Sequence, residues 1–202
     1  MTTAKVRRRF LRKLSERVKS GLILDLGCGM AQTDLALTKV FKEVFIVSVD
    51  FSIEALRIAK RRSKKEDVSL NMVLCDACNL PFKKDIFDVA FSEEVLEHIS
   101  RAHILLSEVQ EVLKVSSSFI VSVPNKMSPF YLAWRKFLAF KRQWIYGEEH
   151  PYTPWGLTKL LGHHNFACKD RFYFEMPRLL RFFDFYKNPT CVRVGVVCIK
   201  KE

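Results

Sequence analysis

Three aspartates and two glycines stand where a nucleotide-like ligand could be held. Asp25 precedes Gly27 and Gly29 in LDLGCGMA, between a buried apolar run and a stretch with helical spacing. Glycines let the backbone turn sharply and approach a ligand closely. Asp50 ends the next apolar run, and a carboxylate there can accept both hydroxyls of a ribose. Asp76 ends the third run, so the three acids favour a ligand that carries positive charge and a ribose.

These acids can meet only if parallel strands bring their carboxyl ends to one edge of a sheet. Short apolar runs predict strands at 21–27, 43–50, 68–75, 86–92 and 118–123, and helical spacing predicts helices at 31–41, 53–63 and 101–114. Alternating strands and helices are typical of an α/β fold with a parallel sheet. Right-handed connections then place helices on both faces.

The first and last parts of the chain carry its positive charge. The formal net charge is +12, with +7 in residues 1–20, −3 in residues 21–125 and +8 in residues 126–202. This balance suggests phosphate, anionic lipid or an acidic protein as partner. The hydrophobic share of 49% excludes a disordered chain.

The N-terminal residues predict a helix. Phe10, Leu14 and Val18 recur every four residues on one face, and Gly21 follows where a helix C-terminal glycine is expected. The segment is also rich in Arg and poor in acids, as a mitochondrial presequence is. We favour a structural helix and keep the cleaved presequence as an alternative.

Cysteine usage bears on compartment and on metal binding. The six cysteines lack the spacing of a disulfide scaffold, and free thiols favour an intracellular protein. Cys75 and Cys78 form a single C-x-x-C pair, which either packs in the fold or has a metal or redox role. We expect packing and no metal. No apolar run reaches the roughly 18 residues of a membrane span.

Several motifs together resemble the class I S-adenosylmethionine-dependent methyltransferases, and the type-11 group in particular. They are LDLGCGMA, VDFSIEALRIAKRR and CDACNLPFKKDIFDVAFSEEVLEHI, in this order within residues 20–125. The resemblance continues into VLKVSSSFIVSVPN and HPYTPWGLTKLLGHHNFACKD. It implies a Rossmann-like sheet of seven mostly parallel strands, with the last strand antiparallel and an insertion after strand five. It also implies S-adenosylmethionine as cofactor and S-adenosylhomocysteine as product.

The resemblance assigns the glycine turn to the methionine part of the cofactor. Asp25, Gly27 and Gly29 would form this turn, and Ser92 and Glu93 would flank the amino-acid end.

The same resemblance assigns the ribose and the adenine. Asp50 would take the ribose hydroxyls with Phe51 beside the adenine, and Asp76 and the backbone of Ala77 would read the adenine edge. Ala31 stands where the family usually has a third glycine. The methyl group is a small addition, so we expect cofactor binding to survive, although a non-catalytic relative stays an alternative.

One domain is expected, in four parts. They are a leading helix at 1–20, a cofactor-binding core at 21–125, a substrate-cover insertion at 126–150, and a C-terminal helix and strand hairpin at 151–202. Thr153 can cap that helix, with Pro154 at its first position.

The reaction implied is displacement of the cofactor's methyl group by a nitrogen, oxygen, sulfur or carbon atom of the acceptor. Positioning supplies most of the catalysis, and a base is needed only if the nucleophile carries a proton with a high pKa. His98 and His150 are the candidate bases, because histidine titrates near physiological pH. His98 has a structural alternative, in which it holds a loop.

The acceptor is expected to be a small molecule, with aromatic, lipid-like and anionic compounds among the candidates. The insertion is rich in aromatic residues: Phe130, Tyr131, Trp134, Phe137, Phe140, Trp144 and Tyr146. With its basic residues it could cover a substrate, contact an anionic membrane or pack on the sheet. An RNA or protein acceptor is the alternative. We expect a cytoplasmic protein, with peripheral membrane contact as an alternative.

Overall fold

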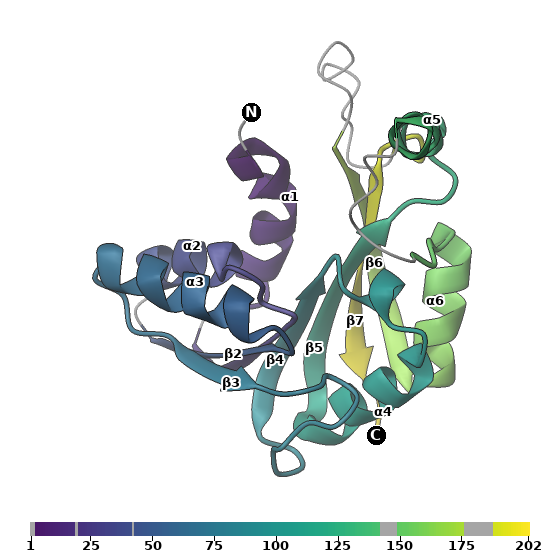
Figure 1. The fold of residues 1–202 in the computed structure, drawn as a ribbon. Coiled ribbons are helices and arrows are strands. Elements are labelled where there is room, and N and C mark those ends of the chain that lie inside the picture. The colour runs from purple at the N-terminus through teal and green to yellow at the C-terminus, as the bar shows by residue number, and fades with distance from the viewer. Residues whose placement is uncertain (1–2, 19, 42, 142–148, 176–187) are drawn as a thin grey trace.

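The computed structural model describes residues 3–18, 20–41, 43–141, 149–175 and 188–202. Within them one sheet of seven strands runs in the order β3-β2-β1-β4-β5-β7-β6 (Figure 1). The strands are β1 (Gly21–Leu26), β2 (Val44–Asp50), β3 (Asn71–Leu74), β4 (Phe87–Glu93), β5 (Leu113–Pro124), β6 (Phe166–Phe174) and β7 (Arg193–Lys200). The helices are α1 (Thr3–Ser15), α2 (Gln32–Val40), α3 (Ile53–Lys65), the short 3-10 helix η1 (Leu96–His98), α4 (Ala102–Val112), α5 (Pro129–Phe140) and α6 (Pro154–His163).

The strand directions match the expected fold. β1 pairs in parallel with β2 and with β4, and the parallel pairing continues to β3 on one side and β5 on the other. β7 lies antiparallel to both of its neighbours, β5 and β6. The Rossmann-like sheet with an antiparallel last strand is therefore confirmed, and the carboxyl ends of β1, β2 and β4 share one edge.

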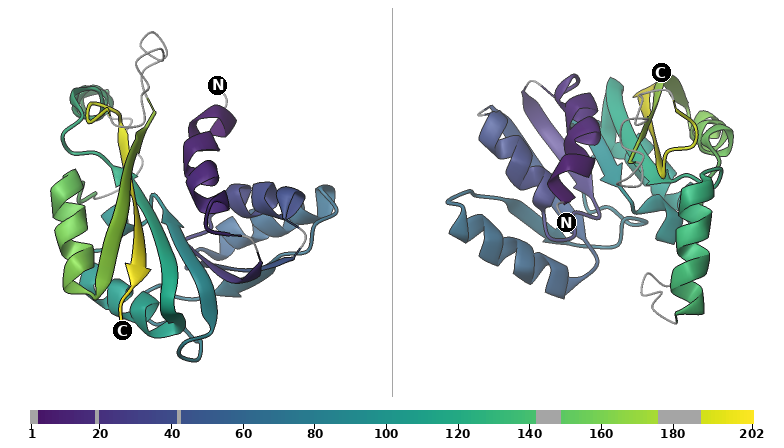
Figure 2. Two further views of the ribbon diagram at one scale, coloured as in Figure 1. Left: turned by 180° about the vertical axis from the view of Figure 1, so that it is seen from behind. Right: turned by 90° about the horizontal axis from the view of Figure 1, so that it is seen from above.

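Helices cover both faces of the sheet, as Figures 1 and 2 show. Alternate residues of each strand point to opposite faces, so neighbours in sequence join different cores. Ile23 packs in the cluster that includes Phe10 of α1 and Leu37 of α2. Leu24 packs in the other cluster, with residues of α4 and α6 such as Leu105. The apolar runs of the sequence are buried on both sides for this reason.

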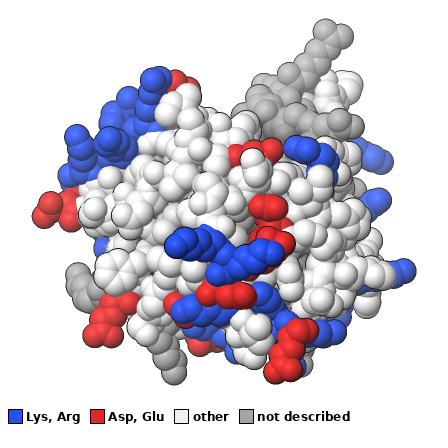
Figure 3. Space-filling model, turned by 90° about the horizontal axis from the view of Figure 1, so that it is seen from below, with Lys and Arg blue, Asp and Glu red and all other residues white. Residues whose placement is uncertain are grey.

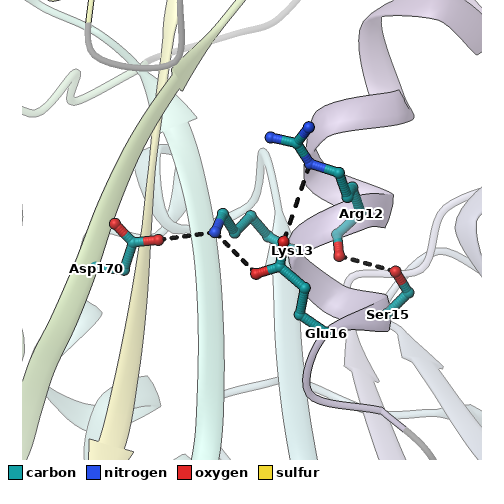
Figure 4. A network of polar contacts seen from close by, with 5 residues as sticks. All are labelled: Arg12, Lys13, Ser15, Glu16 and Asp170. Atoms are coloured by element: carbon teal, nitrogen blue, oxygen red, sulfur yellow. Dashed lines mark hydrogen bonds and ion pairs between the residues drawn. The ribbon is translucent and has the colours of Figure 1, made fainter.

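The leading helix is a packed part of the fold. Phe10 is fully buried, and its ring lies 6.1 Å from that of Phe91 in β4 and 6.4 Å from that of Phe172 in β6. At its edge, Lys13 Nζ lies 3.0 Å from Asp170 Oδ2 of β6 and 2.8 Å from Glu16 Oε2 (Figure 4). This packing agrees with a structural helix.

Gly21 is not the helix C-terminal glycine that the sequence suggested. The helix ends at Ser15, and Gly21 is the first residue of β1 with a φ of 100°. The prediction was wrong because the spacing of Phe10, Leu14 and Val18 suggested a helix up to Val18. Val18 is buried like the other two, but it lies beyond the last helical residue. A Cβ on Gly21 would lie 2.5 Å from Asp88 Oδ2, so a glycine is required by close packing against β4.

Other differences concern element ends. The helix expected at 101–114 ends at Val112, because Leu113 already has extended backbone angles and pairs with Phe87. β3 is shorter than expected. At α6 the expected cap is confirmed, because Thr153 Oγ1 accepts a hydrogen bond from Gly156 N at 3.0 Å.

The insertion contains α5, which is capped by Ser128 and exposes most of its surface. Tyr131 is its buried residue, whereas Trp134, Phe137 and Phe140 are 45%, 55% and 85% exposed. Trp144 and Tyr146, which the sequence also suggested as cover, lie outside the described residues.

Candidate functional site

The glycine turn after β1 is held by backbone geometry. Gly27 and Gly29 have φ angles of 69° and 53°, a region that favours glycine. The N–H groups of Gly27 and Cys28 both donate to Val49 O, at 2.8 and 2.9 Å. A Cβ on Gly27 would lie 2.4 Å from Val95 Cγ2, whereas a Cβ on Gly29 would meet nothing within 4 Å. The turn is thus tight at Gly27 and open at Gly29, where a ligand can approach the backbone.

Ala31 occupies the place of the third glycine in a left-handed conformation. Its φ of 53° and ψ of 36° explain why glycine suits this position, and the alanine there accepts a strain of roughly 1 kcal/mol. It is the N-cap residue of α2, and as an alanine it gives the helix no side-chain hydrogen bond. The first N–H groups of α2 are therefore suited to an anionic group such as a carboxylate.

Asp50 is tied to the glycine turn. Its Oδ2 accepts from Gly29 N at 2.7 Å and its Oδ1 from Ser52 N at 2.8 Å. The cap of α3 is Ser52, whose Oγ accepts from Ala55 N at 3.2 Å. Ser52 rather than Asp50 therefore caps α3. The neighbouring ring of Phe51 is 81% exposed, which is unusual for so apolar a side chain.

Asp76 lies after β3 with half of its side chain exposed. Its Oδ1 accepts from Cys78 N at 2.8 Å, and Arg101 Nη2 donates to its Oδ2 at 3.3 Å. Arg101 precedes α4 and was not suggested by the sequence, because a single exposed arginine carries no pattern. The two groups hold the loop that contains Ala77.

A cavity of about 900 Å³ joins these elements, a size that suits a cofactor. The predicted residues that line it are Gly27, Asp50, Phe51, Asp76, Ala77 and His98. The carboxyl ends of three strands thus meet around one space, as the sequence predicted.

Five other predicted residues lie around this cavity without lining it. Asp25 and Ser92 are buried at the ends of their strands, and Gly29 and Ala31 lie in the turn. Glu93 Oε2 accepts from Thr33 Oγ1 of α2 at 2.7 Å. Their roles toward the cofactor stay predictions.

A second, smaller pocket of about 200 Å³ adjoins the first below α5. Glu94 and His98 line both spaces, so they form the junction. The other residues of the smaller pocket are Glu97, Pro124, Tyr131, Trp134, Glu149, Val192 and Arg193. Sequence reasoning missed the three glutamates and Arg193, because they come together only through the fold of segments around 95, 149 and 193.

Burial changes the protonation of the glutamates. It raises the pKa of Glu94 to about 7, against the effect of Arg193, whose Nε lies 3.0 Å from Glu94 Oε2. Burial, together with nearby Glu94, also raises the pKa of Glu97 well above its usual value. Glu149 Oε2 accepts a hydrogen bond from Tyr131 Oη at 2.6 Å. The smaller pocket is therefore acidic and partly desolvated.

The two candidate bases are placed differently. His98 Nε2 lies 3.9 Å from Glu97 Oε1 and 3.9 Å from Glu149 Oε1, with a third of the side chain exposed. The backbone N–H of His150 donates to Glu97 O at 2.8 Å, while the residue is exposed and lines neither space. The geometry thus favours His98, and the role of His150 stays a prediction.

The cysteines are all free thiols. Burial raises the pKa of Cys75 and of Cys78, so neither is a thiolate at neutral pH. Across the described ranges, no group of three or more His, Cys, Asp or Glu side chains is arranged to hold a metal ion. No described helix is long and apolar enough to span a membrane.

Comparison with known proteins gives a consistent result. A family model described as "Methyltransferase domain" matches residues 18–155. Demethylmenaquinone methyltransferase of Staphylococcus saprophyticus is 33% identical over 110 residues, which are 54% of this chain and 46% of that protein. Probable tRNA methyltransferase 9B of Homo sapiens is 29% identical over 102 residues, 50% of this chain and 20% of that protein. The chain thus spans less than half of either relative.

Among solved structures, the fold is similar to a chain in the complex between the Haloferax volcanii Trm112 methyltransferase activator and a putative methyltransferase. The TM-score is 0.77 at 16% identity, and the match covers 98% of this chain and 92% of that one. Other structures of this fold contain bound S-adenosylhomocysteine.

The fold and the family model agree, because the described strands form a Rossmann-like sheet and the match to a methyltransferase domain covers residues 18–155. The chain belongs to the methyltransferase domain family.

Proposed function

We propose that this methyltransferase acts on a small-molecule acceptor, which enters the smaller pocket below α5 while the cofactor fills the larger cavity. One observation carries the proposal: Glu94 and His98 line both the larger cavity and the smaller pocket. The methyl donor in one space and the methyl acceptor in the other would therefore meet beside His98, a candidate base. The smaller space, about 200 Å³, suits the reacting end of a small compound.

The residues present fit S-adenosylmethionine. The space at the Cβ position of Gly29 is open, so the backbone of the turn can contact the methionine part. Each oxygen of Asp50 accepts one backbone hydrogen bond, which leaves lone pairs for ribose hydroxyls. Phe51 presents an exposed ring for the adenine, and Asp76 with Ala77 borders the same cavity.

When bound, the cofactor would supply an electrophilic methyl group to the acceptor's lone pair, and its sulfur would keep the electron pair of the broken carbon–sulfur bond. The chain's own residues hold the acceptor in line and accept any proton it releases. His98 is the residue at the junction that can take this proton.

The helix α5 serves as the cover of the acceptor pocket. Tyr131 and Trp134 reach the pocket from this helix. The same helix exposes Leu132, Phe137 and Phe140, which packing on the sheet would have buried. Lys136 and Lys141 are exposed beside these apolar residues. Peripheral contact with an anionic membrane is therefore the second candidate role of α5.

An RNA or protein acceptor has less support. Figure 3 shows Lys and Arg alternating with Asp and Glu across the middle of the face seen from below, so the coloured residues form no continuous basic strip there. Two of the basic side chains are already paired, Lys114 with Asp88 at 2.6 Å and Lys200 with Asp85 at 2.7 Å. Strand binding by phosphate contacts needs unpaired basic groups in a track.

Binding of S-adenosylhomocysteine, measured by thermal shift, tests the cofactor site first. We expect a shift for the wild type and little or none for Asp50→Ala, since ligand at about 100 times its Kd adds about 2.7 kcal/mol of stability. Asp67→Ala, an exposed acid outside the site, is the matched control. Absence of a wild-type shift would contradict the proposal.

Retention on anionic liposomes and on RNA at rising salt tests the acceptor class. We expect no salt-sensitive RNA binding. Salt-sensitive retention on RNA without binding to liposomes would instead favour the nucleic-acid alternative.

A further inference from the structure

We propose that the acceptor's nucleophile is a basic amine, which enters the smaller pocket as an ammonium held by Glu94, Glu97 and Glu149. This inference rests on the proposed function, because it names the substrate class of the same pocket. It differs from the anionic, aromatic and lipid-like acceptors that the sequence suggested, since the pocket lining is acidic although the chain is basic.

The lining of the smaller pocket contains more carboxyl groups than permanently charged basic groups. Glu94, Glu97 and Glu149 line it together with one arginine, Arg193. Arg193 Nε already lies 3.0 Å from Glu94 Oε2 and 2.9 Å from Glu175 Oε2. Glu97 and Glu149 therefore bring two further carboxyl groups into the pocket lining, and neither forms an ion pair with this arginine.

Glu97 is the observation that points to a ligand. Its residue is 1% exposed, and neither of its carboxylate oxygens accepts a hydrogen bond within the described part of the chain. The nearest basic nitrogen is His98 Nε2, 3.9 Å from Oε1. A buried carboxylate without donors is costly unless it gains a proton or a cation. An ammonium supplies both a charge and N–H donors.

The aromatic residues of α5 complete an ammonium site. Tyr131 Oη donates to Glu149 Oε2 at 2.6 Å, which fixes this carboxylate below the helix. Trp134 lies three residues on, and both side chains line the pocket. Ring faces attract an ammonium, and this attraction is larger in a desolvated site. An alcohol would gain less here, and a carboxylate would be repelled.

The proton balance uses the junction residue. An ammonium has no lone pair, so it must lose one N–H proton before the nitrogen can form a bond to carbon. His98 Nε2 can accept this proton, which leaves a neutral amine with its lone pair and an imidazolium. Glu97 Oε1 and Glu149 Oε1 each lie 3.9 Å from Nε2, so two carboxyl groups border the nitrogen that receives the proton.

The test measures binding to protein saturated with S-adenosylhomocysteine, by calorimetry and thermal shift. The probes are two size-matched pairs, benzylamine with benzyl alcohol and ethanolamine with ethylene glycol, and benzoate as an anion. We expect at least one amine to bind about tenfold more tightly than its alcohol. Glu97→Gln should abolish this preference, Glu149→Gln should weaken it, and the exposed control Glu54→Gln should retain it.

The outcomes separate this inference from the proposed function. A normal response to S-adenosylhomocysteine without a preference for any amine overturns the amine inference alone. Equal binding of benzoate, or an amine preference that persists in Glu97→Gln, overturns it too. A shift by MgCl2 alone that Glu97→Gln removes would assign the pocket to a metal ion instead. No response to S-adenosylhomocysteine overturns the proposed function itself.

Discussion

The backbone N–H of Gly29 donates to Asp50 Oδ2 at 2.7 Å, which joins the turn after β1 to the end of β2. The same carboxylate accepts from Ser52 N at 2.8 Å, so one side chain fixes the cofactor turn and the start of α3. The position of this carboxylate is therefore set before any ligand binds. This preorganisation lowers the ordering cost of binding.

Asp50→Asn should weaken S-adenosylhomocysteine binding about 10- to 100-fold, because hydrogen bonds to a charged group contribute roughly 1.5–3 kcal/mol. The amide keeps the shape of the carboxylate but removes its charge and half of its acceptor capacity. Calorimetry measures the affinity, and Asp67→Asn, on the exposed turn after α3, serves as control. An unchanged affinity in Asp50→Asn would remove Asp50 from the cofactor site.

The two glycines of the turn should respond differently to alanine. In Gly27→Ala the new Cβ would lie 2.4 Å from Val95 Cγ2 at a φ of 69°, so we expect a loss of several kcal/mol of stability. In Gly29→Ala the Cβ meets nothing within 4 Å, so the loss should be about 1 kcal/mol, from the left-handed backbone alone.

Urea denaturation measures both variants. Gly29→Ala should remain folded and yet bind S-adenosylhomocysteine more weakly, because in the proposed site the ligand approaches the backbone of this turn. If Gly29→Ala bound as the wild type does, the ligand would not approach the turn there.

The sequence predicted residues around the larger cavity better than those around the smaller pocket, for a physical reason. Asp50, Asp76 and the glycines lie at strand ends, and parallel strands necessarily bring their carboxyl ends together. Glu149 and Arg193 line the smaller pocket from segments whose sequence pattern does not predict that they meet. The basic composition also gave a wrong expectation for the smaller pocket. Net charge describes the protein surface as a whole, whereas the lining of this pocket is set by a few buried residues such as Glu97.

Helix α1 should contribute to stability through its core residue rather than through its ion pairs. Phe10→Ala removes a fully buried ring between Phe91 and Phe172, so we expect a loss of about 3–5 kcal/mol. Lys13→Ala breaks partly exposed pairs with Asp170 and Glu16 (Figure 4) and should cost less than about 1 kcal/mol. Equal effects in urea denaturation would contradict the packing of α1 on the sheet.

The contact between Tyr131 and Glu149 should stabilise α5 on the rest of the fold. Tyr131→Phe removes the hydrogen bond of 2.6 Å and leaves a buried carboxylate without this donor, so we expect a loss of about 2 kcal/mol. A double-mutant cycle with Glu149→Gln isolates the pair, and its coupling energy should be at least about 1 kcal/mol. Strictly additive effects would mean that the contact does not hold the helix.

Stability should fall as pH rises, and Glu97 should be one cause. Burial holds the folded-state pKa of Glu97 above its unfolded value near 4.5, so folding favours the protonated form. This stabilisation is fully present below the unfolded pKa and is lost as pH rises through the folded one. Glu94, with a pKa of about 7, acts in the same direction, whereas His164, whose pKa burial lowers, acts in the opposite one.

Comparison with Glu97→Gln separates Glu97 from these other groups, because the amide cannot titrate. The melting temperatures of the wild type and Glu97→Gln should differ little at pH 5. They should diverge toward pH 8, with the variant the more stable of the two, since it no longer buries a charge without donors. Glu54→Gln, whose side chain is 69% exposed, should follow the wild type at every pH. Parallel curves of melting temperature against pH for the wild type and Glu97→Gln would show that Glu97 keeps its ordinary pKa. A cation could then bind in the pocket without releasing a proton from Glu97.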